Sequence, residues 1–290
     1  MKVDFYPQAL FDQYLEHLIE RALNEDVGEG DHTSLSIFPE PATLTARLLV
    51  KTDGIIAGTT LAERIFRKLD PSVSYTTHFH DGERVTKGDI VFDVSGQARA
   101  IITAERLVLN FMQHLSGIAS KTNKMLDLIK DYPAKLLDTR KTTPGLRLLE
   151  KYAVKTGGGN NHRIGLYDMI LIKDNHIDFA GSITKAVEMA KEYVYQHQLQ
   201  LKIEVELRSF EDIAEALKIG SIERVLLDNF TPEDLAKAIK LIDRRLITEA
   251  SGGINDSNIV DYAKSGVDFI SCGFLTHTLQ PLDLSMKINI

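Results

Sequence analysis

The sequence predicts an α/β protein in which an N-terminal α+β portion precedes an incomplete parallel α/β barrel. In the N-terminal portion, short β-rich runs are separated by turn signals such as Asp53-Gly54 and Asp81-Gly82. Beyond about residue 118, short apolar runs alternate with longer helical patterns, which indicates parallel βαβ units. About six such units occupy roughly 160 residues, whereas eight usually take about 250. The barrel is therefore expected to fall short of eight strands.

The N-terminal portion begins with residues 1–26, which form an amphipathic helical pattern and lack the apolar core and cleavage site of a signal peptide. Three extended runs follow at 43–50, 75–79 and 90–94. A helix at 59–69 interrupts them. This order predicts an α+β arrangement.

A long helix from about Thr103 to Asp131 follows, and the boundary between two domains is expected near Gly117. The strands predicted after it are 134–139, 167–173, 201–207, 224–229, 246–251 and 268–273. The helices predicted between them include 181–197, 209–219, 231–241 and 255–265. The predicted domains are therefore residues 1–117 and residues 118–275.

The composition argues against several classes of function. A net charge of -7 and a pI of about 5.7 disfavour broad affinity for nucleic acid or anionic lipid. No run approaches the roughly 20 apolar residues of a membrane-spanning helix. The single cysteine, Cys272, excludes an intrachain disulfide and a cysteine-rich metal site. We therefore expect a soluble cytoplasmic protein with neither nucleic-acid nor membrane partners.

Against this acidic background, cationic side chains concentrate between residues 138 and 176. They are Arg140, Lys141, Arg147, Lys151, Lys155, His162, Arg163, Lys173 and His176. Such a concentration in an acidic protein predicts a pocket for a small substrate that carries several negative charges.

Polar residues also follow six predicted strands, at the point where each strand ends. They are Asp138-Thr139-Arg140, Lys173-Asp174-Asn175, Glu206, Asp228-Asn229, Ser251-Gly252-Gly253 and Gly273. The carboxyl ends of parallel barrel strands meet at one rim, where substrates bind. Taken together, these residues predict an active site, although each one also has an ordinary structural interpretation.

Three of the charged residues illustrate these alternatives. Glu206 shares one strand face with Glu204, and inside a barrel both carboxylates need cationic, metal or hydrogen-bond partners. Asp228 is either a functional carboxylate or a turn and helix-capping residue. Lys173 is either a Schiff-base lysine or a substrate anchor.

Glycine-containing turns end the last two predicted strands, at Ser251-Gly252-Gly253 and Ser271-Cys272-Gly273. Glycine lets backbone N–H groups approach a phosphate closely, and a following helix N-terminus favours negative charge. A phosphate site competes here with a pair of tight turns. The run Gly157-Gly158-Gly159 instead predicts a mobile loop over the site, and neither a GxxxxGK nor a GxGxxG motif occurs.

His162 follows that run without an HExxH or HxH pattern, which argues against a tight zinc site. It is either a structural histidine or, beside Arg163, part of an anion-binding group, and we favour the second. Cys272 has no obvious base nearby in the pattern, which argues against a nucleophile. Arg106 adjoins Glu105 early in the long helix, where a surface ion pair is the ordinary interpretation.

Motifs covering nearly the whole chain in order resemble those of the quinolinate phosphoribosyltransferases, also called nicotinate-nucleotide pyrophosphorylases. They are EDVGEGDHTS (25–34), TAERLVLNFMQHLSGIAS (103–120), DTRKTTPGLRLLEKYAVKTGGGNNHR (138–163), LIKDNHI (171–177), EVE (204–206), LLDN (226–229), EASGGI (249–254) and GFLTH (273–277). The central block is highly specific. Small departures from the family pattern occur in the turn at 27–31, at Cys272 and at Thr278.

The resemblance implies a Mg²⁺-dependent reaction of NAD biosynthesis. Quinolinate and phosphoribosyl pyrophosphate would give nicotinate mononucleotide, pyrophosphate and carbon dioxide. It also implies the type II phosphoribosyltransferase fold, in which an α+β open sandwich precedes the incomplete barrel and residues 276–290 return to the first domain. Subunits would pair at least as homodimers, with the first domain of one covering the barrel mouth of the other.

Roles for individual residues follow from the same motifs. The residues implied to surround the quinolinate carboxylates are Arg140, His162, Arg163 and Lys173, and those implied to hold the 5′-phosphate are Ser251, Gly252, Gly253 and Gly273. Thr139 is also expected to bind substrate, Lys141 to bridge towards the phosphoribosyl donor, and Arg106 to reach the neighbouring subunit's site. Glu206 and Asp228 would face the ribose and hold Mg²⁺, directly or through water and pyrophosphate. With Lys141 they are the expected catalytic residues.

Three other interpretations compete with this one. A related phosphoribosyltransferase could act on another heteroaromatic carboxylate, although a monocarboxylate would not need so many cations. A Schiff-base aldolase would use Lys173, but nothing specific in the sequence supports it. A catalytically silent phosphate-binding barrel would be expected to lack some charged rim residues, and those sought are present.

Overall fold

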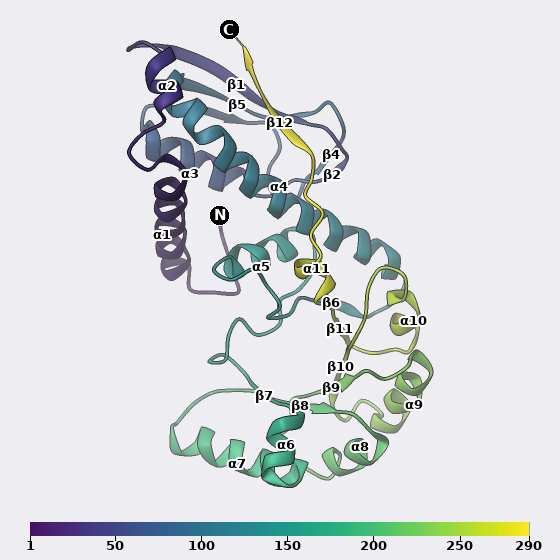
Figure 1. The fold of residues 1–290 in the computed structure, drawn as a ribbon. Helices are drawn as coiled ribbons and strands as arrows, with labels where there is room; N and C mark the ends of the chain where they lie inside the picture. Colours follow the sequence, from purple (N-terminus) through teal and green to yellow (C-terminus); the bar gives the residue numbers. More distant parts are fainter. Residues whose placement is uncertain (290) are drawn as a thin grey trace. The chain divides into compact units, whose positions relative to one another are not determined.

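The structure, a computed structural model, describes residues 1–289. The chain divides into two compact units (Figure 1). The first contains residues 1–123, 148–158 and the C-terminal segment from Thr278, and the second contains residues 124–147 and 159–277. The first unit thus extends a little beyond the predicted boundary near Gly117 and takes in residues 148–158, which lie within the range predicted for the second domain.

The first unit is built around an antiparallel sheet of four strands in the order β12-β1-β5-β3. The strands of this unit are β1 (Thr43–Val50), β2 (Gly54–Ile55), β3 (Ser74–Thr77), β4 (Arg84–Val85), β5 (Ile90–Gln97) and β12 (Leu284–Asn289). The helices are α1 (Gln8–Val27), α2 (His32–Ile37), α3 (Thr59–Leu69), α4 (Ala98–Ile129, which continues into the second unit) and α5 (Arg147–Thr156). The strands and helices predicted up to residue 131 are all present.

Alternation along β1 explains how this unit forms its core. Ala46, Leu48 and Val50 are fully buried, whereas the intervening residues are partly exposed. Leu48 pairs with Phe92 of β5, whose ring packs edge-on against Phe66 of α3 at a centroid distance of 6.0 Å. One face of the sheet is therefore covered by α3.

The C-terminal strand β12 pairs with the outer side of β1, with Met286 opposite Leu48. Residues from Thr278 onward belong to the first unit, on which we expected residues 276–290 to pack. Residue 290 lies outside the described residues.

The glycine run before His162 does not form the loop over the site that we predicted. Gly157 is buried at the end of α5, and a Cβ atom there would lie 2.3 Å from the carbonyl oxygen of Ala119 on α4. Gly158 has φ +95°, which favours glycine. The prediction was wrong because these glycines serve close backbone packing and a helix end.

The second unit is a curved sheet of six parallel strands in the order β6-β11-β10-β9-β8-β7. The strands are β6 (Lys135–Leu137), β7 (Ile170–Ile172), β8 (Ile203–Leu207), β9 (Arg224–Asp228), β10 (Ile247–Ser251) and β11 (Phe269–Ser271). The helices are α6 (Asp174–Ala180), α7 (Ile183–Gln196), α8 (Phe210–Ala216), α9 (Pro232–Ile242), α10 (Ile259–Lys264) and α11 (Phe274–His277).

All six predicted barrel strands are confirmed, as are the helices now labelled α7 to α10. These helices lie along the outer side of the curved row of strands (Figure 1). Strands β6 and β7 end the sheet, and no ladder among the described residues joins them to each other. The barrel is therefore incomplete, as predicted. Within residues 1–289 no helix has both the length and the apolar character needed to span a bilayer.

Candidate active site

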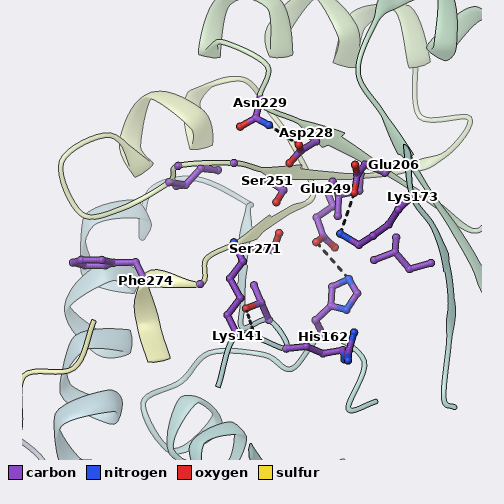
Figure 2. Close-up of a pocket in the computed structure, with 18 of the residues that line it drawn as sticks. Lys141, His162, Lys173, Glu206, Asp228, Asn229, Glu249, Ser251, Ser271 and Phe274 are labelled. Carbon is purple, nitrogen blue, oxygen red and sulfur yellow. Dashed lines mark hydrogen bonds and ion pairs between the residues drawn. The ribbon is translucent and has the colours of Figure 1, made fainter. Parts of the chain in front are cut away.

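A pocket of about 770 Å³ opens at the carboxyl ends of the barrel strands (Figure 2). Among the residues that line it are Thr139, Arg140, Lys141, His162, Arg163, Lys173, Glu206, Asp228, Ser251, Gly252, Gly253 and Gly273. These include every predicted site residue except Arg106. Parallel strands bring most of these residues together because they lie at or beyond the ends of their strands. His162 and Arg163 instead follow α5, in a segment that an isolated bridge between Leu137 and Asn160 joins to β6.

Arg106 does not line this pocket. It is exposed on α4, in the first of the two units. The pocket described here therefore consists of residues from the second unit alone.

Other residues also line the pocket, and of these only Asp174 and Asn229 were among the polar residues noted at the ends of the predicted strands. The additional lining residues are Leu171, Asp174, Leu226, Asn229, Glu249, Ile254, Asn255, Ser271, Phe274 and His277. Glu249 could have been found, since it precedes Ser251 by two positions on β10 and so shares its face. Phe274 and His277 lie on α11, a helix that we did not predict.

The cationic side of the pocket brings two guanidinium groups close together. Arg163 is only 8% exposed, and its Nη1 donates to the carbonyl of Met169 at 3.1 Å. Burial and the neighbouring charge of Arg140 lower the pKa of Arg163. The Nε of Arg140 is buried and has no hydrogen-bond acceptor among the described residues. Two like charges with unused donor capacity favour an anionic ligand, and guanidinium groups match carboxylates well.

Lys173 and Glu206 face each other across the pocket wall. The Nζ of Lys173 donates to Oε2 of Glu206 at 3.2 Å (Figure 2). Glu206 is 7% exposed, whereas the side chain of Lys173 is about half exposed. The pair therefore satisfies the buried carboxylate and leaves Lys173 accessible from the pocket.

The loop after β6 is held by hydrogen bonds at several points. Thr139 Oγ1 accepts the backbone N–H of Lys141 at 3.0 Å, and Thr276 Oγ1 donates to the carbonyl of Lys141 at 2.6 Å. Arg147 donates to Thr142 Oγ1 and to the carbonyls of Arg140 and Ile164. This loop is consequently fixed with Arg140 and Lys141 at the pocket.

Four cations of the 138–176 segment do not line the pocket. Arg147 donates to the carbonyl of Arg140 and so supports the loop after β6. His176 accepts the backbone N–H of Lys173 through Nδ1 at 2.9 Å. Lys151 is fully buried on α5, and Lys155 pairs with Asp4 at 3.3 Å, both within the first unit. Proximity in sequence did not reveal that α5 belongs to the other unit.

Asp138 also has a structural position. It is fully buried and accepts the backbone N–H of His162 at 2.8 Å and the side-chain amide of Asn161 at 2.5 Å. These bonds attach the start of the His162 segment to the end of β6. The carboxylate therefore positions the wall of the pocket.

Asp228 ends β9 and is oriented by its neighbour Asn229. The amide nitrogen of Asn229 donates to Oδ2 of Asp228 at 2.5 Å, while the backbone of Asn229 occupies the left-handed region at φ +58° (Figure 2). The amide oxygen of Asn229 lies against Gly252, where a Cβ atom would approach it to 2.2 Å. Asn229 thus contacts both Asp228 and the glycine turn after β10.

The two glycine turns have the backbone freedom that we expected. Gly252 and Gly253 have φ +104° and +62°, and a Cβ on Gly273 would lie 3.0 Å from the Lys141 side chain. Helix α10, however, begins only at Ile259, so it does not directly follow the first turn as predicted. An anion at this turn would therefore meet backbone N–H groups of the turn and not the N-terminus of α10.

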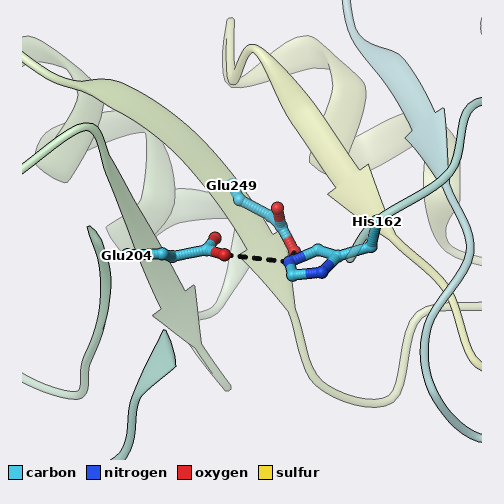
Figure 3. A group of neighbouring side chains, drawn as sticks. All are labelled: His162, Glu204 and Glu249. Carbon is cyan, nitrogen blue, oxygen red and sulfur yellow. Dashed lines mark ion pairs between the residues drawn. The ribbon is translucent and has the colours of Figure 1, made fainter. Parts of the chain in front are cut away.

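Below these groups lies a buried cluster of His162, Glu204 and Glu249 (Figure 3). The Nε2 of His162 is 2.9 Å from Oε2 of Glu204 and 3.5 Å from Oε1 of Glu249. Arg224 Nη1 contacts the other oxygen of Glu249 at 2.7 Å and lies over the ring of Phe269. Burial raises the pKa of Glu204, and burial and the nearby Glu204 raise the pKa of Glu249 to about 7.

A parallel barrel whose strand ends gather cations, two carboxylates and glycine turns defines the class: an enzyme that handles substrates with several negative charges. Comparison with known families agrees. The family model "Quinolinate phosphoribosyl transferase, N-terminal domain" matches residues 31–116, and the corresponding C-terminal domain model matches residues 118–287.

Individual relatives match over nearly the full chain. A mitochondrial quinolinate phosphoribosyltransferase [decarboxylating] 2 of Nicotiana glauca is 43% identical over 95% of this chain and 82% of its own length. A probable nicotinate-nucleotide pyrophosphorylase [carboxylating] of Bacillus subtilis (strain 168) is 42% identical over 95% of this chain and 94% of its own. The solved structure of the nicotinate-nucleotide pyrophosphorylase from Francisella tularensis superimposes with a TM-score of 0.91 at 39% identity, covering 99% and 100% of the two chains.

The chain therefore belongs to the quinolinate phosphoribosyltransferase family, the carboxylating nicotinate-nucleotide pyrophosphorylases of NAD biosynthesis. The predicted type II phosphoribosyltransferase fold is confirmed by the same matches.

Proposed function

We propose that the pocket binds quinolinate between Arg140, Arg163 and Lys173 and binds the donor phosphates at the two glycine turns. The observation that carries this proposal is the pair of crowded guanidinium groups, one with a buried Nε that has no acceptor. Quinolinate supplies two adjacent carboxylates, which forked guanidinium groups can bind in bidentate fashion. Binding these two carboxylates requires several cations in one place, which accounts for a cation-rich pocket in an acidic chain.

The proposed chemistry begins with transfer of the ribosyl group. The pyridine nitrogen forms a bond to C1′ of the donor while the bond from C1′ to pyrophosphate breaks, and the leaving group keeps the electron pair. Glu206 and Asp228 lie on one side of the pocket, where carboxylates stabilise positive charge that develops at C1′. Lys141 approaches Gly273 of the second turn and supplies positive charge to the departing phosphates.

Decarboxylation follows on the same intermediate. Once the ring nitrogen carries ribose, its positive charge stabilises the electron pair left at C2 as the bond to carbon dioxide breaks. C2 then takes a proton, and nicotinate mononucleotide forms. The residues around the carboxylates need only hold the ring in place, so no organic cofactor is required.

The donor set at the pocket fits Mg²⁺. Glu206 and Asp228 offer carboxylate oxygens in the lining of the pocket, and Mg²⁺ prefers oxygen ligands while keeping waters and substrate phosphates. The buried cluster that includes His162 suits it less, because an imidazole nitrogen is a poor ligand for this ion. When bound, the ion would neutralise charge on the leaving pyrophosphate.

We also propose that two copies of the chain pair and that Arg106 of one copy completes the pocket of the other, whether or not pairs assemble further. Arg106 is an exposed cation outside the pocket of its own chain. Large apolar side chains lie exposed around β7 and α6, including Leu166, Phe179 and Met189. Such a group favours burial against another protein surface. A cytoplasmic location remains part of the proposal, to be checked by cell fractionation.

A turnover assay tests the function directly. Purified protein is incubated with quinolinate, phosphoribosyl pyrophosphate and Mg²⁺, and pyrophosphate, carbon dioxide and nicotinate mononucleotide are measured together. We expect equal amounts of the three products and no reaction when nicotinate replaces quinolinate or when Mg²⁺ is chelated. Turnover of a different heteroaromatic carboxylate, with none of quinolinate, would contradict the proposed substrate.

The role of Arg140 has its own test. Arg140→Ala should weaken quinolinate binding by about a hundredfold, because a charged bidentate partner is lost. Donor affinity should stay nearly unchanged. Binding of each substrate is measured separately by calorimetry, and equal weakening of both would contradict the assignment.

A further inference from the structure

The cluster of His162, Glu204 and Glu249 has the ligand types and spacing of a transition-metal site (Figure 3). All three side chains are at most 7% exposed. Neither carboxylate oxygen of Glu204 accepts a well-formed hydrogen bond among the described residues, and neither does Oε1 of Glu249. Buried oxygens in this condition require a cation, a proton or a donor nearby.

The two ring nitrogens of His162 distinguish these possibilities. The backbone N–H of Arg163 donates to Nδ1 of His162 at 2.7 Å. A backbone N–H can only donate, so Nδ1 must present a lone pair. In a neutral imidazole the hydrogen then belongs to Nε2, which faces the two carboxylates.

This arrangement excludes the two alternatives on chemical grounds. An imidazolium carries hydrogen on both nitrogens, so Nδ1–H would oppose the N–H of Arg163. A metal on Nε2 would likewise require hydrogen on Nδ1, since a ligating histidine normally donates its other N–H. A hydrogen-bond donor at Nε2 remains.

We propose that His162 is a positioning residue, fixed as the neutral Nε2–H tautomer, whose Nε2–H faces the Glu204–Glu249 pair and whose Nδ1 holds the backbone of Arg163 at the pocket. It contributes neither a positive charge nor a metal ligand. This differs from the role of a cation beside quinolinate that the motif resemblance implied. The consequence for quinolinate binding rests on the proposed function.

The charges around the pair support this assignment. Arg224 neutralises one carboxylate through its 2.7 Å contact with Glu249. Burial raises the pKa of Glu249 to about 7, so the two carboxyl groups together can retain one proton near neutrality and present a single negative charge to Arg224. With a neutral His162, the group formed by His162, the two carboxyls and Arg224 carries no net charge. It therefore does not repel a dianionic substrate in the pocket.

Nitrogen NMR on the unmodified, ligand-free protein tests the tautomer. His162→Gln identifies the signals by their absence. We expect the His162 signals to show the neutral Nε2–H form throughout about pH 5.5 to 8.5. A protonated ring, an Nδ1–H tautomer, or stoichiometric Zn²⁺ binding that His162→Gln abolishes would overturn the proposal.

Two substitutions test the positioning role. The amide nitrogen of glutamine reaches the place of Nε2 and remains a donor, whereas the shorter asparagine does not. His162→Asn should raise KM for quinolinate by about tenfold, the cost of leaving a buried acceptor without its donor, and change KM for the donor by less than about twofold. His162→Gln should raise KM for quinolinate less than His162→Asn does, because glutamine keeps a donor at the place of Nε2. Equal effects of the two substitutions, or equal effects on both substrates, would overturn the role.

The two experiments separate this inference from the proposed function. Absence of turnover by the wild-type protein would contradict the function and leave the NMR result intact. The NMR measurement of the tautomer likewise remains valid if the asparagine variant does not fold.

Discussion

At the scale of single residues, Glu249 shows how burial changes the chemistry of a carboxyl group. It has no exposed surface, and its pKa rises from 4.5 to about 7, first through burial and then through Glu204. The folded protein therefore holds this proton between about pH 4.5 and 7, where the unfolded chain has released it. The contribution of this group to stability is greatest below pH 4.5 and declines as pH rises to about 7.

Glu249→Gln should remove this dependence, because the amide does not ionise. Relative to the wild type, the variant should gain stability as pH rises from 4.5 to 7, by at most about 3 kcal/mol, as 1.36 kcal/mol per pKa unit gives. Denaturant unfolding at a series of pH values measures the difference. Exposed Glu188→Gln is the control, and an identical pH slope in wild type and Glu249→Gln would contradict the prediction.

Gly252 and Gly253 allow a matched comparison of two adjacent glycines. Both have positive φ, but a Cβ on Gly252 would collide with Asn229, whereas one on Gly253 meets no atom within 4 Å. Gly253→Ala should cost about 1 kcal/mol of stability from backbone strain alone. Gly252→Ala should cost more and should displace Asn229 and with it Asp228.

The kinetic result should follow the same order. We expect Gly252→Ala to raise KM for phosphoribosyl pyrophosphate by about tenfold more than Gly253→Ala does, since a misplaced group near the reacting centre is costly. Steady-state kinetics with the donor varied at saturating quinolinate measure this. Equal effects would show that Asn229 does not couple the turn to Asp228.

At the scale of helices and strands, local signals explain the accuracy of most sequence predictions. Helix α8 begins at Ser209, which forms a capping box with Asp212, and α9 begins with Thr231 as cap and Pro232 in its first turn. Such signals depend only on neighbouring residues. The barrel strands were recognisable for a similar reason, because they contain short, largely buried apolar runs such as Val225-Leu226-Leu227.

What local patterns left out has a common cause at this scale. The pairing of β12 with β1 joins residues more than 200 positions apart, and α5 belongs to a unit formed mostly by earlier residues. Glu204 was noticed through strand alternation, but its contact with His162 and Glu249 joins three separate segments. Sequence patterns give the face on which a residue lies but not its distant partner.

Strand β12 provides a test of that pairing. Met286 is 7% exposed and lies opposite Leu48, whereas the next residue, Lys287, is exposed. Met286→Asp would bury an unpaired carboxylate and should lower the free energy of unfolding by about 3 kcal/mol. Lys287→Asp should change it by less than about 0.5 kcal/mol. Thermal and denaturant unfolding measure both, and equal losses would contradict the burial of Met286.

At the scale of the whole molecule, charge is distributed unevenly. A chain of net charge -7 gathers Arg140, Arg163 and Lys173 at one pocket, so binding of anionic substrates depends on local rather than total charge. The resemblance to known motifs predicted the family correctly, while the position of Arg106 relative to a second copy stays a prediction. An arginine supplied by a second copy would make activity a property of the assembly.

Mixing two inactive variants tests whether Arg106 acts across subunits. Arg106→Ala and Arg140→Ala should each be nearly inactive when pure, because each removes a cation from every pocket. In a mixed dimer, one pocket carries both substitutions and the other carries neither. Random exchange of equal amounts makes half of the dimers mixed, so activity should recover to about a quarter of the wild-type value.

The control for this experiment is a mixture of Arg140→Ala with Lys173→Ala, two substitutions in the same pocket of one chain. Each pocket of that mixed dimer keeps one defect, so no recovery is expected. Subunits are exchanged by mild denaturation and renaturation, and initial rates are compared at equal total protein. Recovery in the control, or none with Arg106→Ala, would show that Arg106 does not complete the pocket of a partner subunit.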